Sequence, residues 1–149
     1  MNIKVDYENK ITIISDIEEF DLLKTLRSGQ TFRYFETKDG VVVINKKIAT
    51  LLNVNEKRDL IVHSVDKEVV DTWIKYFNLE TDYVEIKNRI IKIEKKMKDI
   101  VKSASGVRII KQDEWETIVS FILSANNNIK RITKLVNLIA ETYDDFIGE

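Results

Sequence analysis

The fold is decided by residues 31–45, TFRYFETKDGVVVIN, in which two runs of strand-forming residues flank Lys38-Asp39-Gly40. An Asp-Gly pair between apolar runs is typical of a tight β-hairpin, because both residues tolerate the positive φ angles that hairpin turns require. We therefore predict strands over residues 31–36 and 41–45 that pair in antiparallel fashion.

The rest of the first half of the chain fits the same sheet. Three further runs rich in strand-forming residues are candidate strands: residues 3–7, 11–15 and 60–65. Residues 17–27 are predicted to be helical, because Phe20, Leu23 and Leu26 recur at three-residue spacing. Together these elements predict an antiparallel sheet domain with one or two helices over residues 1–80.

The second half is patterned for helices. Apolar residues recur at spacings of three and four in four candidate helices: residues 67–77, 84–102, 113–125 and 128–143. Asp113 precedes Glu116 by three residues, as in a capping box, and Asn128 can cap the last helix. The predicted fold class is therefore α+β, with a helical segment over residues 81–149.

Composition excludes several classes of protein. The 149 residues include no cysteine, no proline and only four glycines. A disulfide scaffold, a thiolate nucleophile and a cysteine-ligated metal site are thereby excluded, as are collagen-like and linker sequences. No apolar run approaches the roughly 18 residues of a membrane helix, and no secretory core is visible. We expect a soluble cytoplasmic or nucleoid-associated protein with no membrane partner.

Residue patterns of catalysis are also missing. The sequence shows no Ser/His/Asp set, no Gly-rich phosphate loop and no metal-ligand cluster. His63 is the only histidine and lies in a candidate strand, which favours a structural or surface role. From the residues alone we predict no metal, no cofactor and no catalytic residue within this chain.

Charge is segregated along the chain. Residues 1–86 carry 12 Lys and Arg against 16 Asp and Glu, whereas residues 87–134 carry 12 against 5. The basic residues are Lys87, Arg89, Lys92, Lys95, Lys96, Lys98, Lys102, Arg108, Lys111, Lys130, Arg131 and Lys134. Such a local excess is either a solvated helix face or the electrostatic footprint of a polyanion such as nucleic acid.

Three segments carry a resemblance to a known family. They are FDLLKTLRSGQTFRYF (residues 20–35), WIKYFNL (residues 73–79) and GVRIIKQDEWETIVSFILSANNNIKRITKLVNLIAETY (residues 106–143). In this order they resemble the 8-oxoguanine DNA glycosylase/AP lyase family of the helix-hairpin-helix superfamily. The most specific parts are SGQTFR at residues 28–33 and NNNIKRI at residues 126–132. The resemblance implies a TBP-like sheet domain followed by the first helices of a catalytic domain.

The resemblance implies a lesion-recognition role for Gly29. Oxidation turns guanine N7 from an acceptor into an N–H donor, and in the family the backbone carbonyl of the matching glycine accepts from it. The missing side chain lets the backbone approach a flipped base. Local sequence also allows a simpler role for Gly29 as the C-terminal cap of the preceding helix, and the two roles are compatible.

The resemblance also implies contacts to the cytosine that loses its partner. Asn126 and Arg131 match the residues that bind this estranged cytosine, for which an amide oxygen and a guanidinium are complementary groups. Asn127 matches the residue that fills or borders the vacated space. The local alternatives are an inter-helix turn in which Asn128 is the cap, and a solvated Arg131.

The resemblance places the chemistry outside this chain. The family's helix-hairpin-helix and its Schiff-base lysine would lie beyond Glu149, so we expect an N-terminal fragment that is inactive alone. The expected parent function is excision of 8-oxoguanine opposite cytosine from double-stranded DNA. We also expect self-association through apolar helix faces left exposed. The alternatives are a stand-alone, non-catalytic DNA- or protein-binding module, and a glycosylase with another base specificity.

Overall fold

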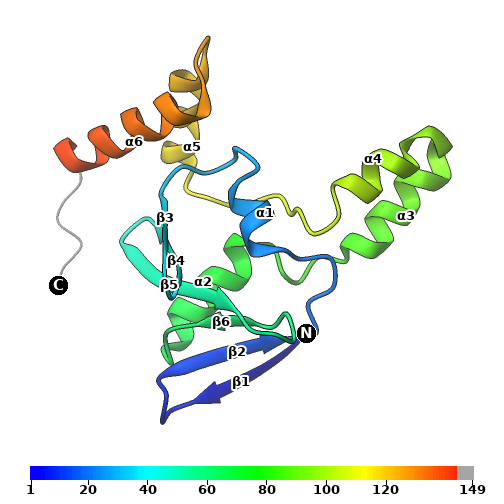
Figure 1. Cartoon of the computed structure of the whole chain (residues 1–149), viewed down its shortest axis with the longest axis horizontal. Helices are drawn as coiled ribbons and strands as arrows, with labels where there is room; N and C mark the ends of the chain where they lie inside the picture. The colour runs from blue at the N-terminus through cyan, green and yellow to red at the C-terminus, as the bar shows by residue number, and fades with distance from the viewer. Residues whose placement is uncertain (144–149) are drawn as a thin grey trace.

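A six-stranded antiparallel sheet forms one layer of the molecule in the computed structural model, which describes residues 1–143 (Figure 1). Its strands are β1 (Asn2–Asp6), β2 (Ile11–Ser15), β3 (Tyr34–Thr37), β4 (Gly40–Asn45), β5 (Ile48–Val54) and β6 (Leu60–Val62). Their order across the sheet is β1-β2-β6-β5-β4-β3, with every neighbouring pair antiparallel. The predicted α+β class is confirmed.

The predicted hairpin forms, but its two turn residues are Lys38 and Asp39, and Gly40 is the first residue of β4. The sequence analysis missed the strand that follows this hairpin. β3 pairs with β4 around the turn, with Thr37 opposite Gly40. β5 pairs with β4 through a two-residue turn in which Lys46 has a φ of +54°. That turn contains no glycine, asparagine or aspartate, so the usual hairpin signal is absent from it.

The core lies between one face of the sheet and two helices, α1 (Leu22–Leu26) and α2 (Lys67–Tyr76). Along β4, Val41, Val43 and Asn45 are buried in alternation with half-exposed residues, as expected for a sheet covered on one face. On α2 the rings of Trp73, Tyr76 and Phe77 pack against one another with centroids 5.0 to 6.1 Å apart. The WIKYFNL segment is therefore the aromatic centre of the core.

The helix predicted over residues 17–27 is wrong in its length and in its buried face. Only Leu22–Leu26 is helical, because Asp16 and Glu19 take φ angles of +55° and +51° and Asp21 caps the helix. Leu22 and Leu26 are buried, whereas Leu23 is exposed. A five-residue helix is too short for three-residue spacing to define a face.

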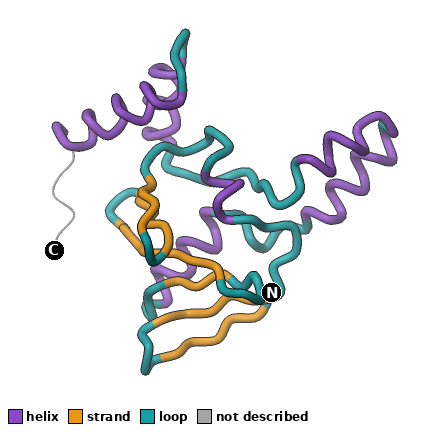
Figure 2. The backbone as a smooth tube through the Cα atoms, in the orientation of Figure 1, coloured by secondary structure: helices purple, strands orange, loops and turns teal. Residues whose placement is uncertain are grey.

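The single helix predicted over residues 84–102 is also wrong. The segment forms α3 (Tyr83–Ile93), a 3₁₀ turn η1 (Lys95–Met97) and α4 (Lys98–Ser103). Glu94 breaks the helix by taking extended backbone angles, and its side chain caps the 3₁₀ turn by accepting from the Lys96 N–H. The two helices form a hairpin that projects from the body, called the α3–α4 arm below (residues 83–103) (Figure 2).

The last two described helices are α5 (Glu114–Ser124) and α6 (Ile129–Tyr143), which pack against each other. Both predicted caps are confirmed: the Glu116 N–H donates to Asp113 over 3.1 Å, and the Arg131 N–H donates to Asn128 over 3.1 Å. Within residues 1–143 no helix has the length and apolarity needed to cross a membrane.

Candidate nucleic-acid interface

The two most specific sequence motifs meet in the structure. A Cβ atom built on Gly29 would lie 3.9 Å from Cδ1 of Ile129, the first residue of α6. Beside this contact, Phe32 forms a small buried cluster with Ile132 and Val136 of α6. The segment that leaves α1 and the turn that begins α6 are therefore packed together, although about 100 residues separate them.

Gly29 lies two residues beyond Arg27, the C-cap residue of α1, and its role in lesion recognition stays a prediction. It follows the end of α1 with a φ of +83°, a conformation that favours glycine. Within residues 1–143 no donor is hydrogen-bonded to its carbonyl oxygen. The residue thus sits at the end of a helix with its carbonyl available to another donor.

Gln30 holds the Gly29 segment against residues 105–112, which return from the arm. Its Oε1 accepts from the Ile110 N–H over 3.0 Å, and its Nε2 donates to the Arg108 carbonyl over 2.9 Å. Its own carbonyl accepts from Nε2 of Gln112 over 2.6 Å. The glutamine of the SGQTFR motif is therefore a positioning residue that fixes the backbone on the C-terminal side of Gly29.

The asparagine run divides into bonded and unbonded side chains. The Asn128 side chain caps α6, and the Asn127 side chain donates to the Leu123 carbonyl over 3.1 Å. Asn126 has a φ of +51° and an exposed side chain, and Arg131 is exposed one turn into α6. Neither the Asn126 amide nor the Arg131 guanidinium has a partner among the described residues, so both groups are open to a ligand.

Arg108 lies in the basic stretch of residues 87–134, but its side chain is not on the surface. It is 2% exposed, and its guanidinium donates to the carbonyls of Glu18, Glu19, Asn78 and Thr81. Burial lowers the pKa of this guanidinium below its usual value. Arg108 is therefore an interior crosslink between three loops.

Glu19 anchors both helices of the arm. Its carboxylate pairs with Lys87 of α3 and also accepts from Ser105 Oγ and the Gly106 N–H, each over 3.0 Å. The hydrogen bond from Lys87 is the main reason that the pKa of Glu19 lies below its usual value. This carboxylate thus ties the first turns of α3 to the residues that follow α4.

Replacing Glu19 by glutamine is expected to lower the free energy of unfolding by about 1–3 kcal/mol near neutral pH, because Lys87 loses a charged partner. The pKa of Glu19 is lowered in the folded state, so its contribution is present above the unfolded pKa and is lost as the pH falls through the folded pKa. Urea unfolding of the unsubstituted chain and of the Glu19→Gln variant, between neutral pH and pH about 3, checks this. A difference in the free energy of unfolding that does not narrow on acidification would contradict the prediction.

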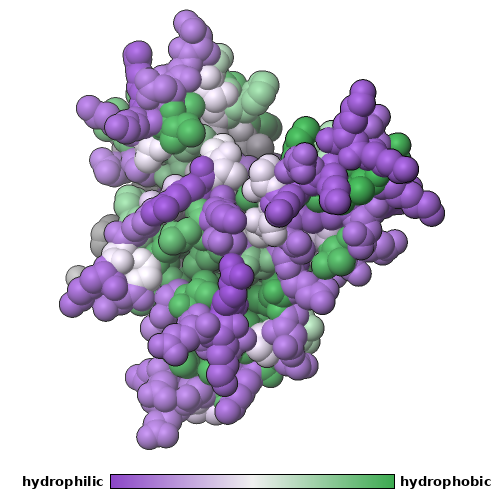
Figure 3. Space-filling model, turned by 45° about the vertical axis from the view of Figure 1, so that its right-hand side comes forward, coloured by the Kyte–Doolittle hydropathy of each residue, from purple (hydrophilic) through white to green (hydrophobic). Residues whose placement is uncertain are grey.

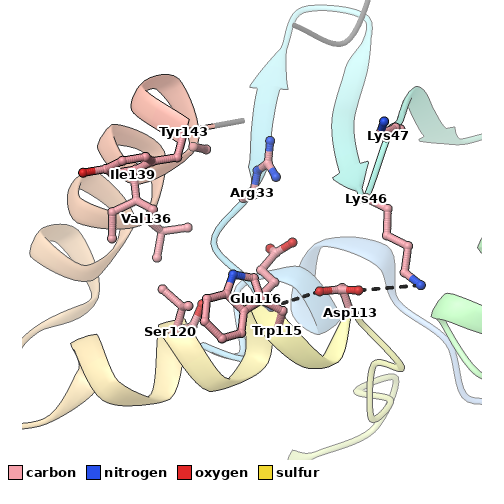
Figure 4. A pocket seen from close by; sticks show the side chains of 12 residues that line it. Arg33, Lys46, Lys47, Asp113, Trp115, Glu116, Ser120, Val136, Ile139 and Tyr143 are labelled. Atoms are coloured by element: carbon pink, nitrogen blue, oxygen red, sulfur yellow. Dashed lines mark hydrogen bonds and ion pairs between the residues drawn. The ribbon is translucent and has the colours of Figure 1, made fainter. Parts of the chain in front are cut away.

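A pocket of about 350 Å³ lies between the β-hairpins and the pair α5–α6 (Figure 4). Arg33 of the SGQTFR motif lines it, together with Trp115 of α5 and Val136 of α6. At its edge Lys46 pairs with Asp113 over 3.6 Å, which ties the β4–β5 turn to the start of α5. The lining of this pocket includes none of the four residues predicted to contact DNA, nor Ile129.

Among residues 1–143 no group of three His, Cys, Asp or Glu side chains could hold a metal ion. The His63 ring is hydrogen-bonded to the Asn53 side chain of β5. On α5, Trp115 and Phe121 are 73% and 77% exposed; self-association through such faces stays a prediction.

Comparison with known proteins identifies the family. A family model described as 8-oxoguanine DNA glycosylase, N-terminal domain, matches residues 12–118. An N-glycosylase/DNA lyase of Saccharomyces cerevisiae is 27% identical over 144 residues, covering 87% of this chain and 38% of the relative. An N-glycosylase/DNA lyase of Arabidopsis thaliana is 28% identical over 130 residues, covering 82% and 35%.

Solved structures give the same answer. The Clostridium acetobutylicum 8-oxoguanine glycosylase/lyase, in complex with double-stranded DNA containing cytosine opposite 8-oxoguanine, has a TM-score of 0.85 at 28% identity. MBOgg1 in complex with a low affinity DNA ligand has a TM-score of 0.84 at 31% identity. This chain is covered completely in both comparisons, but it spans only 52% and 53% of those chains.

The chain therefore spans about half of the similar solved structures and little more than a third of the curated relatives. The matched residues include the whole SGQTFR motif, the aromatic core and the start of α5. The family model covers well over half of the sequence, and the fold is shared over its full length. This chain belongs to the 8-oxoguanine DNA glycosylase family and carries its N-terminal domain.

Proposed function

We propose that this chain is the DNA-reading part of a repair N-glycosylase/lyase that removes 8-oxoguanine paired with cytosine. The observation that carries the proposal is the packing of the Gly29–Phe32 segment against the start of α6, which brings an unbonded carbonyl near a turn bearing the unbonded side chains of Asn126 and Arg131. Double-stranded DNA is the proposed partner, so we expect the protein wherever the genome lies: the cytoplasm or the nucleoid.

Lesion recognition is assigned to the Gly29 carbonyl. An N7–H donor distinguishes 8-oxoguanine from guanine, and a carbonyl oxygen accepts from the first and repels the N7 lone pair of the second. The Gln30 hydrogen bonds keep the adjacent backbone in place, so the carbonyl need not reorganise when a flipped base arrives.

Recognition of the estranged cytosine is assigned to Asn126 and Arg131. The amide oxygen of Asn126 can accept from cytosine N4, while the Arg131 guanidinium can donate to N3 and O2. Asn127, held by the Leu123 carbonyl, borders the space that the lesion leaves. No lysine of residues 1–143 is assigned the nucleophile's role, and we expect the chain alone to leave the glycosidic bond intact.

The test measures binding of the chain to duplexes in which cytosine or adenine lies opposite a tetrahydrofuran abasic analogue. Such a cytosine is already unpaired, so the assay isolates its recognition from base flipping. We expect preference for cytosine, and we expect Arg131→Ala to remove about 1–3 kcal/mol of that preference, as loss of a bidentate base contact does.

The matched control is Lys134→Ala, which removes an exposed charge from the same helix. This variant should weaken binding to both duplexes equally, because a phosphate contact carries no base information. An Arg131→Ala variant that behaves like the control would remove the cytosine-reading role. A wild-type chain that binds neither duplex would remove the proposed function itself.

A further inference from the structure

The α3–α4 arm is a strongly basic projection that the proposed function does not use. Residues 83–103 carry seven Lys and Arg against three Asp and Glu. Lys87 is the one that pairs with Glu19, and its side chain is only 13% exposed. The remaining six are exposed and have no ion pair or side-chain hydrogen bond within residues 1–143: Arg89, Lys92, Lys95, Lys96, Lys98 and Lys102.

The base of the arm is fixed to the body by several independent contacts. Besides the Glu19 carboxylate, Tyr83 accepts from the Ile109 N–H over 2.9 Å, and its ring lies 4.5 Å from the Arg108 guanidinium. Arg108 also bonds to the Asn78 and Thr81 carbonyls, which precede α3. The six free charges are therefore carried by a braced element.

The arm and the Gly29 segment are both held by hydrogen bonds to residues 106–110. The residues that follow α4 bond first to α1, where Thr25 Oγ1 donates to the Gly106 carbonyl over 3.1 Å. They then bond to the Gln30 side chain through the Arg108 carbonyl and the Ile110 N–H. The arm and the pair α5–α6 project as separate lobes on the side away from β1, with the outline concave between them (Figures 1 and 3).

We propose that the α3–α4 arm is a second DNA-contacting surface, which binds phosphates of the duplex outside the lesion-reading site. The inference rests on the proposed function for its partner. Unpaired cations on a braced element suit a polyanion, since phosphate contacts need charge and position but no base recognition. The duplex is favoured over a membrane because the chain belongs to a DNA glycosylase family, and because both the arm and Gln30, next to Gly29, bond to residues 106–110.

The experiment compares the chain with the variant Lys95→Gln, Lys96→Gln, Lys98→Gln on an undamaged duplex over a range of salt concentrations. Each phosphate contact contributes about 0.9 to the slope of log affinity against log salt. We expect the variant's slope to be shallower by about 2 to 3 and its affinity at low salt to fall about tenfold or more. These side chains are exposed, and circular dichroism verifies that the helices remain.

The matched control, Lys4→Gln, Lys38→Gln, Lys57→Gln, removes the same charge from exposed positions on the sheet and its turns. If both variants lose affinity equally, only net charge matters and the arm proposal is overturned. Binding of the arm to phosphatidylserine vesicles with unchanged duplex affinity would overturn it in favour of a membrane surface.

The abasic-duplex assay separates this proposal from the proposed function. The arm variant should keep the preference for cytosine opposite the abasic analogue, because Asn126 and Arg131 are intact. If the lysine variant shows the shallower salt dependence but the wild-type chain shows no preference for cytosine, the arm proposal is supported and the proposed reading site is contradicted. If the wild-type chain prefers cytosine but the lysine variant binds the undamaged duplex unchanged, the reading site is supported and the arm proposal is overturned.

Discussion

Replacing Arg108 by alanine is expected to lower the free energy of unfolding by about 3–5 kcal/mol, a loss reached only when a buried network is broken. The guanidinium donates to four carbonyls, two in residues 18–19 and two at Asn78 and Thr81. Alanine leaves these acceptors without their donor and removes the side chain that covers the Tyr83 ring. Lysine, a single point of charge, cannot reach the same set of acceptors.

Urea unfolding followed by circular dichroism measures this loss. The control is Lys111→Ala, three residues along the same segment, whose exposed side chain makes no hydrogen bond within the described residues. We expect the control to change the free energy of unfolding by less than about 0.5 kcal/mol. Comparable losses in the two variants would show that the Arg108 crosslink contributes little.

The contrast between Arg108 and Lys111 shows where sequence patterns stop being informative. Both are basic residues in one charged stretch, and no local pattern separates the buried arginine from the exposed lysine. Burial of Arg108 is created by carbonyls from residues 18–19 and 78–81, which only the tertiary fold brings to it. The hairpin at residues 37–40 and the caps at Asp113 and Asn128, by contrast, depend on residues close in sequence and were predictable.

The candidate site shows the same division. Resemblance identified the SGQTFR and NNNIKRI motifs, but not that Phe32 of the first packs against Ile132 of the second. The role of Gln30 as a clamp was missed, because its partners at residues 108–112 lie about 80 residues away. The break at Glu94 was missed because the isoleucine spacing continues through it. The local feature that marks the break is the Glu94 side chain, which caps the 3₁₀ turn that follows it.

Replacing Gly106 by alanine is expected to lower the free energy of unfolding by about 2–5 kcal/mol. Its φ of +85° costs an L-residue about 1–2 kcal/mol. A new Cβ would also lie 2.7 Å from Cβ of Asp21 and 3.2 Å from its backbone nitrogen. Overpacking of this kind costs about 1–3 kcal/mol. The clash falls on a close contact, since the Asp21 N–H donates to the Gly106 carbonyl over 2.8 Å.

The Gly29→Ala variant separates the backbone cost of the positive φ angle from the cost of overpacking. Its φ of +83° matches that of Gly106, but the nearest atom to a new Cβ is Cδ1 of Ile129 at 3.9 Å, an ordinary contact. We therefore expect only the backbone cost of about 1–2 kcal/mol at Gly29. Equal losses in urea unfolding would mean that the chain around Asp21 moves aside. In that case the Gly106 N–H, which donates to Glu19, would move with it. The arm would then lose part of its bracing, and the Gly106→Ala variant should show the shallower salt dependence expected of the lysine variant.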